Sequence, residues 1–545
     1  MKKPLYTLGM AAALLSACST SQTPTASTGA ATTAEKPAAA ANPTTYASTI
    51  TAADLERHLR IIASDSLEGR ETGERGQKMA AEYIANHFKA TGLAGPVNTG
   101  SNPYYQTFNL EKSTWGEGYV NVGAKKFSMG KDFFVLGASP YQTETATQVV
   151  FAGYGIDDPA YSDYTNLDVT GKTVVVLAGE PKNSAGNYLI SGTDKVSTWT
   201  QDSRTKSAAA TKKGAKSVIV VTGTTDAEFQ QMTKRYASYL SRPSIGFGST
   251  ASQPRAALIL ASPTMGASLL STTPAKLMAY GTTVAKAGKP VASTFKPAAN
   301  VKIKTERKSQ PLPTENVLGY LEGSDLKDEL VVISAHYDHE GIKDGKVYNG
   351  ANDDGSGTVA VLELAEAFAQ AKKDGHGPRR SMLFLTVTGE EKGLLGSEYY
   401  TEHPVFPLEN TVADLNIDMI GRNDKEHEGN FNYIYVIGSD KLSSELHAIS
   451  ENANKTYTNL ELDYTFNDPN DPNRFYYRSD HYNFAKHRIP IAFYFNGVHE
   501  DYHQETDEVD KINFPSAEKV TRLVFYTAWD LVNRDARIKV DSNKK

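Results

Sequence analysis

The clearest sign of the fold class is the stretch LVVISAHYDH at residues 330–339. Its first half is a run of apolar and mostly β-branched residues that predicts a buried strand, and a histidine and an aspartate follow where the strand ends. Further strands are expected at 382–388, 413–417, 433–437 and 489–495, with amphipathic helices at 359–371 and 516–533. Strands that alternate with helices predict an α/β fold around a mainly parallel central sheet flanked by helices.

Four further segments carry possible metal ligands close to predicted strand ends. They are NGANDDGSG at 349–357, TGEEKG at 388–393, NIDMIG at 416–421 and DYHQETD at 501–507. Loops at the carboxyl ends of strands are where α/β sheets bind ligands. Each segment alone is compatible with a solvated turn or a surface pair of acids. Their occurrence together, in this order, indicates a metal site built from histidines and carboxylates.

Composition narrows the class of protein. The chain has 545 residues, too many for one ordinary core, so two or three domains are expected. A net charge of −6 argues against a nucleic-acid binder, and no apolar run is long enough for a transmembrane helix. The one cysteine, Cys18, excludes an internal disulfide framework and a thiolate metal site.

The first 47 residues are expected to lie outside the fold. Residues 1–18 have a basic start, a short apolar stretch and Leu15-Ser16-Ala17 before Cys18, which is typical of a bacterial lipoprotein signal peptide with a lipid attached to Cys18. An ordinary signal peptide is the alternative. Residues 19–47 are rich in Ser, Thr, Ala and Pro, which predicts a disordered linker. We therefore expect an exported protein, held through its lipid at the outer membrane or in the periplasm.

Three regions follow the linker. Residues 48–140 begin a catalytic domain, with a helix capped by Thr51 and another at 77–90, in which His87 is interpreted as a core histidine. Residues 141–302 contain short β-rich runs without a cluster of histidines and carboxylates, which indicates a separate non-catalytic domain. Residues 303–540 carry the predicted metal ligands.

These segments resemble the M28 metallopeptidases, a family of zinc exopeptidases. The resemblance covers residues 48–110 and 310–535, and LEGRETG at 67–73 looks like the start of the family's catalytic domain. Residues 141–302 resemble the protease-associated (PA) domain that some members carry as an insertion. One departure is Asn352, where many relatives have an acidic residue, although this is not a ligand position.

The resemblance implies two zinc ions per chain, bridged by a hydroxide. His336 and Asp418 would bind one ion, Glu391 and His503 would bind the other, and Asp353 would bridge both. Cobalt or manganese could replace zinc on such ligands. The family also has a cis peptide after the bridging aspartate, which implies a cis bond between Asp353 and Asp354.

Four other residues receive expected roles. The resemblance implies that Glu390 is the general base and that Asp338 orients His336 by accepting its other ring proton. Asp480 and His481 are expected to contact substrate or to support the metal ligands, with a purely structural role as the alternative.

Several functions fit these residues. The leading hypothesis is an aminopeptidase that acts on peptide substrates, although neither the metals nor the base selects the amino or the carboxyl terminus. One alternative is a glutaminyl cyclase with a single zinc. Another is a surface-binding lipoprotein without catalytic activity. The sequence does not specify the oligomeric state.

Overall fold

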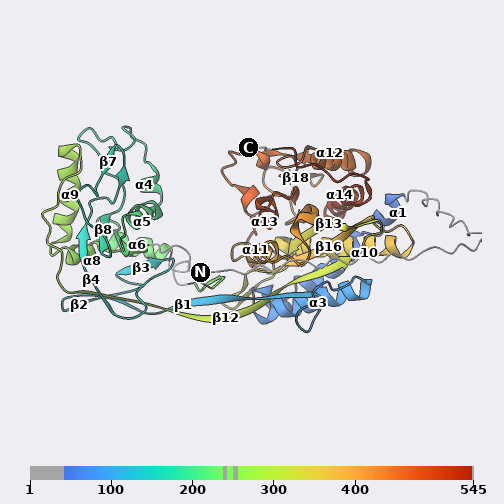
Figure 1. The fold of residues 1–545 in the computed structure, drawn as a ribbon, viewed down its shortest axis with the longest axis horizontal. Coiled ribbons are helices and arrows are strands. Elements are labelled where there is room, and N and C mark those ends of the chain that lie inside the picture. Colours follow the sequence, from blue (N-terminus) through green and yellow to red (C-terminus); the bar gives the residue numbers. More distant parts are fainter. Residues whose placement is uncertain (1–41, 237–241, 249–255, 543–545) are drawn as a thin grey trace, which may run out of the picture. The chain divides into compact units, whose positions relative to one another are not determined.

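The structure is a computed structural model that describes residues 42–236, 242–248 and 256–542 (Figure 1). The predicted signal peptide, Cys18 and most of the predicted linker lie outside these residues. The linker prediction is wrong at its end, because helix α1 (Pro43–Ala47) falls within it. Tyr46 of this helix is buried and stacks on Trp529, with 5.8 Å between ring centroids. This contact folds a segment whose composition resembles that of the linker.

The central sheet is mixed, with a parallel core. Its strand order is β10-β1-β12-β16-β13-β17-β20-β18-β19. The middle strands are parallel to one another: β16 (Arg380–Val387), β13 (Leu326–His336), β17 (Thr411–Ile417) and β20 (Ile491–Phe495). On either side, β12 (Val301–Leu321) and β18 (Tyr433–Ile437) run antiparallel to their neighbours. The α/β prediction is therefore confirmed, with four parallel strands that precede the site and a further parallel pair, β18 and β19, at the edge of the sheet.

Helices flank these strands. The first group comprises α2 (Ala52–Ile62), α3 (Arg75–Thr91), α10 (Gly357–Lys373) and α14 (Phe514–Asn533). The second comprises α11 (Leu395–Glu402) and α13 (His481–Lys486). Helix α12 (Ser444–Ala453) packs against α14 of the first group. Leu330 and Val332 alternate along β13, and they pack in one buried cluster with Tyr400 of α11 and Phe484 of α13. Helices α10 and α14 of the first group also contact β13.

Two long antiparallel strands flank the inserted region in the sequence, one before it and one after it. Strand β1 (Tyr105–Val122) pairs with β12 over most of its length, with an irregularity between Trp115 and Gly118. The short strands at the edges are β2 (Lys125–Ser128), β4 (Thr145–Thr147), β10 (Ser244–Gly246) and β19 (Glu461–Asp463). The chain enters the insertion after β1 and returns from it along β12.

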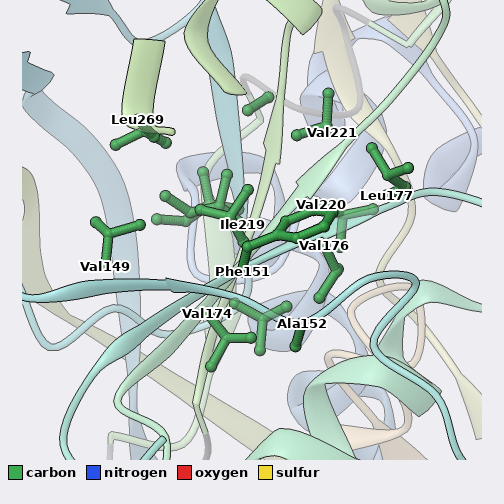
Figure 2. Close-up of a cluster of buried hydrophobic side chains, with 14 of the residues drawn as sticks. Val149, Phe151, Ala152, Val174, Val176, Leu177, Ile219, Val220, Val221 and Leu269 are labelled. Carbon is green, nitrogen blue, oxygen red and sulfur yellow. The ribbon is translucent and has the colours of Figure 1, made fainter. Parts of the chain in front are cut away.

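The insertion has its own five-stranded sheet. The strands, in order, are β3 (Phe133–Leu136), β11 (Ala257–Ala261), β9 (Ser217–Val221), β8 (Thr173–Leu177) and β5 (Val149–Phe151). Its described residues include the helices α4 (Thr198–Gln201), α5 (Ser203–Lys212), α6 (Asp226–Arg235), α8 (Pro263–Leu269) and α9 (Pro274–Ala287). Figure 2 shows Phe151, Val174 and Ile219 within its buried apolar core. A second core supports a separate β-rich domain, and its assignment to the PA type stays a prediction.

In the described ranges, no helix has the length and apolar character needed to span a bilayer.

Candidate metal centre

The predicted ligands converge at the carboxyl ends of the parallel strands. His336 is the last residue of β13, and Asp418 directly follows β17. Glu391 lies in the loop after β16, and His503 lies in the loop after β20. Asp353 comes from the turn at residues 351–356 that leads into α10. Because neighbouring parallel strands end at the same edge, residues far apart in the sequence are brought together there.

The two carboxylate oxygens of Asp353 face different partners. Oδ1 lies 3.2 Å from Nε2 of His336, and Oδ2 lies 3.0 Å from Nε2 of His503. On the first side, His336 Nε2 is 3.8 Å from Oδ1 of Asp418. On the second side, His503 Nε2 is 3.1 Å from Oε2 of Glu391. The five side chains thus form two groups that share Asp353.

The donor set fits cations. Four of its buried atoms have no hydrogen-bond partner, namely Nε2 of His336, Oδ2 of Asp353, Oε1 of Glu391 and Oδ1 of Asp418. Unpartnered buried polar atoms are costly, and they converge here among several carboxylates. Histidine nitrogens and carboxylate oxygens are the ligands that zinc accepts when no cysteine is available. The residues therefore fit a site for metal ions, with His336 and His503 on opposite sides of Asp353.

The pKa shifts reflect the crowded negative charge. Burial opposes protonation of His336, but the carboxylates of Glu390 and Asp353 outweigh it and raise the pKa of the ring well above its usual range. Burial also opposes protonation of His503, whose pKa is raised to about 10 by Asp353 and Glu391. Such a potential attracts cations.

Glu390 lies beside His336 and Asp418, close enough to form a possible metal-binding group with them. Its Oε2 is 3.9 Å from Nε2 of His336, and its side chain lines the cavity at the site. Burial raises the pKa of its carboxyl well above its usual range, and the nearby carboxylate of Glu391 acts in the same direction. A raised carboxyl pKa suits a group that takes up and returns a proton near neutral pH.

Asp338 contacts the second ring nitrogen of His336, as the resemblance implied, and does so through its backbone carbonyl oxygen. Nδ1 of His336 lies 3.0 Å from the backbone carbonyl oxygen of Asp338, whereas the nearest carboxylate oxygen is 3.8 Å away. The carboxylate accepts hydrogen bonds from the hydroxyl of Thr72 at 2.6 Å and from the backbone N–H of Glu390 at 3.2 Å. The side chain thus connects the loop of Glu390 to the loop after β13, and the carbonyl orients the ring.

Arg70, from the LEGRETG segment, holds two of the ligand-bearing loops. Its buried guanidinium donates to the carbonyl oxygens of Tyr337 at 2.7 Å, Asn349 at 2.6 Å, Gly350 at 3.0 Å and Ile62 at 2.6 Å. Burial lowers its pKa to about 10, so the group stays cationic at neutral pH. The sequence analysis gave this arginine no role.

Asp507 and Asp354 fix the turn that carries Asp353. Asp507 accepts from the backbone N–H groups of Asn352 at 3.0 Å and Asp353 at 3.1 Å. Asp354 accepts from the N–H groups of His336 at 3.2 Å, Gly357 at 2.8 Å and Met419 at 3.1 Å. The bond between Asp353 and Asp354 is cis, as the resemblance implied. Asn352 accepts from the N–H of Gly421 at 2.7 Å, and it does not face the metal ligands.

Asp480 and His481 are buried and do not line the cavity. Asp480 accepts a hydrogen bond from Ser397 at 2.5 Å, and burial raises the pKa of its carboxyl to about 7. His481 stacks on Phe493, and its Nε2 lies 2.9 Å from the carbonyl oxygen of Tyr476. This geometry favours the structural alternative for His481. Ser479, their neighbour, donates to Oδ2 of Asp418 at 2.7 Å and so orients a ligand.

His339 is a residue of the site that the sequence analysis quoted without a role. It is fully buried, and its Nδ1 lies 2.8 Å from Oε1 of Glu391 and 3.9 Å from Oδ2 of Asp353. Its position three residues after His336, in the same strand-end loop, is the signal that could have pointed to it.

The cavity at the site combines charged and apolar walls. Asp353, Glu390 and Asp418 form its charged wall. The other lining residues are Met419, Phe475, Arg478, Phe493, Phe495, Val498 and Tyr502. Of the tyrosines in the segment before Asp480, neither Tyr476 nor Tyr477 lines it.

An α/β sheet with paired groups of histidines and carboxylates at its carboxyl edge is a candidate metal centre. Residues 316–528 match the model of Peptidase family M28.

Curated relatives match parts of the chain. A probable zinc metalloprotease of Pyricularia oryzae is 36% identical over 119 residues, 21% of this chain and 22% of its own. A probable glutamate carboxypeptidase of Arthroderma benhamiae is 32% identical over 124 residues, 23% of this chain and 16% of its own. Aminopeptidase YwaD of Bacillus subtilis is 30% identical over 148 residues, 24% of this chain and 30% of its own. Each match therefore spans less than a third of the relative.

The fold as a whole is similar to a solved aminopeptidase from Aneurinibacillus sp. strain AM-1. The TM-score is 0.52 at 17% sequence identity, and the alignment covers 92% of this chain and 99% of that one. At this identity the similarity concerns the fold.

Proposed function

We propose that this protein is a two-zinc aminopeptidase that hydrolyses peptide bonds. The proposal rests on the two carboxylate oxygens of Asp353, because Oδ1 faces His336 and Oδ2 faces His503. A carboxylate with one oxygen toward each of two ligand groups is what a pair of dications requires as a bridge. The M28 match over residues 316–528 and the zinc metalloprotease and aminopeptidase names of relatives support the same reading.

The roles of the residues follow from their positions. His336 and Asp418 would hold one zinc ion, Glu391 and His503 the other, and Asp353 both. When bound, the zinc ions polarise the peptide carbonyl and lower the pKa of a water molecule, so that water can act as nucleophile near neutral pH. Glu390 takes the proton of that water and delivers it to the leaving amine nitrogen. The carboxylate of Asp338 accepts a hydrogen bond from the backbone N–H of Glu390 and so keeps Glu390 in place.

The apolar wall of the cavity suggests a substrate class. Phe475, Phe493, Phe495 and Val498 line it close to Glu390. Each methylene buried there contributes about 0.8 kcal/mol. We therefore expect leucyl or phenylalanyl substrates to exceed alanyl substrates in kcat/KM by about tenfold or more.

The test is hydrolysis of aminoacyl-arylamides by the full protein. We expect activity that a chelator abolishes and zinc restores, and Glu390→Gln should lower kcat by about 10²–10⁴-fold with the metal content unchanged. Glu409→Gln, an exposed carboxylate in the loop before β17, is the matched control and should keep full activity. Release of residues from the carboxyl terminus would instead identify a carboxypeptidase.

Other results would favour the alternatives. One catalytic zinc per chain together with cyclisation of an N-terminal glutamine peptide would identify a glutaminyl cyclase. A fully metal-loaded protein without activity on a broad peptide panel would favour the surface-binding lipoprotein.

We also propose that Cys18 carries a lipid that holds the protein at the outer membrane, and that residues 141–302 form a PA domain that controls access of substrate. Incorporation of a labelled fatty acid into the wild type but not into Cys18→Ser tests the first proposal. Unchanged selectivity among peptides of different length after deletion of the insertion would contradict the second.

A further inference from the structure

A second cluster of metal-ligand side chains lies among helices α2, α3 and α10, and it shares no residue with the catalytic site. His58 comes from α2 and His87 from α3. Glu363 and Glu366 come from α10, where a spacing of three residues puts them on one face. The segments that meet here are separated by nearly 300 residues of sequence, and no part of the proposed peptidase chemistry uses them.

The ligand atoms point at one another at distances typical of a coordination shell. Nε2 of His58 lies 3.5 Å from Oε1 of Glu363 and 3.8 Å from Oε1 of Glu366, and Nε2 of His87 lies 3.3 Å from the same atom of Glu366. Ligand atoms at about 2.0–2.1 Å from a tetrahedral zinc ion are about 3.3–3.4 Å apart. The separation between His87 and Glu366 equals this value, and the two separations from His58 exceed it by up to about 0.5 Å.

Three of these atoms are buried without a hydrogen-bond partner. They are Nε2 of His58, Nε2 of His87 and Oε1 of Glu363. His58 is only 1% exposed and Glu363 only 2%, so water does not compensate them. The two imidazole nitrogens left in this way lie within 4.8 Å of each other and of a carboxylate oxygen of Glu366, and a divalent cation would be a common partner for them.

The remaining atoms of the two histidines are already oriented. Nδ1 of His58 lies 2.6 Å from the hydroxyl of Tyr83, and His87 is hydrogen-bonded to the backbone of Leu362. Metal-binding histidines commonly use their second ring nitrogen in this manner, which fixes the ring and leaves the other nitrogen free for the ion. The rings are perpendicular, with centroids 4.7 Å apart, so both Nε2 atoms can approach one point.

The charges of the cluster also favour a cation. Burial and the neighbouring Glu366 raise the pKa of the Glu363 carboxyl to about 8, and a divalent cation held by His58, His87 and Glu366 would offset this excess of acidic groups. Burial lowers the pKa of His87 to about 4, so its ring is neutral and available as a ligand at physiological pH. The nearby Arg57 forms its hydrogen bonds with Asp54 and does not occupy the cluster. Glu366 is 41% exposed and provides a path for the ion.

We propose that His58, His87 and Glu366 bind a zinc ion, with the carboxyl group of Glu363 beside His58, and that this ion joins the N-terminal helices α2 and α3 to α10. Two histidines and a carboxylate are a set of donors that zinc accepts. Each helix supplies part of the shell, and α10 starts directly after the turn that carries Asp353. The ion would therefore stabilise the helices that support the catalytic edge of the sheet without entering the reaction.

The experiment counts metals in the full protein. We expect Glu366→Gln and His87→Gln each to contain one zinc equivalent per chain fewer than the wild type after dialysis against buffered zinc, measured by plasma mass spectrometry. Arylamide hydrolysis should change by less than about twofold, because neither residue contacts the catalytic ligands. His447→Gln is the matched control, since it removes a histidine 3.9 Å from Glu451 at the surface, and it should not change the count.

The measured quantity is the difference in zinc per chain between each variant and the wild type, so it does not depend on how many ions the catalytic site holds. Asp353→Asn should lose catalytic zinc and keep this one. Equal zinc content in the wild type, Glu366→Gln and His87→Gln would overturn the proposal. If a substitution prevents folding, anomalous diffraction from wild-type crystals at the zinc edge decides. We expect an anomalous peak between Nε2 of His58 and Nε2 of His87. A water molecule at that position, in crystals whose catalytic sites hold zinc, would refute the proposal.

Discussion

The guanidinium of Arg70 offers the sharpest test of how the site is held together. It donates to four buried carbonyl oxygens, two of which belong to the Asn349-Gly350 segment before Asp353 and one to Tyr337 beside His336. Arg70→Met keeps much of the volume and removes every donor. The loops that carry the bridging carboxylate and His336 would then lose their common anchor.

The magnitude follows from the bonds. Each hydrogen bond from a charged donor contributes about 1.5–3 kcal/mol, and each buried carbonyl left without a partner costs about 1–3 kcal/mol. These terms are not additive among neighbours, so we expect a loss of about 4 kcal/mol or more in the free energy of unfolding. Because a displacement of about 1 Å at a catalytic group can cost roughly 10²-fold in rate, kcat/KM should fall by about that factor.

The assay combines urea unfolding, followed by circular dichroism, with arylamide hydrolysis and metal content. Arg70→Lys is the informative companion, because one ammonium group cannot reach carbonyls on three separate segments, and it should recover only part of the loss. Arg60→Met makes the same substitution at an exposed arginine that pairs with Glu56 and Asp510, and it should leave activity unchanged. If Arg70→Met matched the wild type in stability and metal content, the proposed anchoring would be wrong.

Three further predictions concern other buried groups. Asp507→Ala leaves the N–H groups of Asn352 and Asp353 without an acceptor, so zinc affinity should weaken about 10–100-fold in a chelator competition assay; unchanged affinity would contradict this role. Burial raises the pKa of Asp414 to about 8, above its unfolded value, so the stability it contributes is present at low pH and is lost as pH rises through about 8. Asp414→Asn should therefore lose less stability than the wild type between pH 5 and pH 9, as shown by urea midpoints, and parallel pH profiles would refute the assignment. Tyr46→Ala removes the stack on Trp529 and should cost about 2–4 kcal/mol, visible as a lower Tm, whereas an unchanged Tm would mean that α1 does not belong to the fold.

Local patterns in the sequence were sufficient for the elements and for most of the site. Apolar runs predicted the strands before His336, Glu390 and Asp418, because burial on both faces requires continuous apolar residues. Carboxylates and histidines directly after such runs pointed to the carboxyl edge of the sheet. Alternation at Gln106, Phe108 and Leu110 was a further local signal, for strand β1, that the sequence analysis left unused.

Contacts between distant segments were not accessible in the same way. Whether Asp353 divides its oxygens between His336 and His503, which oxygen of Asp338 meets the ring, and whether Arg70 reaches the ligand loops all depend on side-chain positions set by packing. The same holds for His87, which was interpreted as a core histidine and lies against His58 and Glu366. The chain alone thus predicted an α/β fold with candidate metal ligands at strand ends, because periodicity and ligand chemistry are local properties, and the role of each ligand came from the family resemblance. The pairing of those ligands and the second cluster came from the folded chain, because a distance between residues far apart in sequence exists only after the sheet has brought its strand ends together.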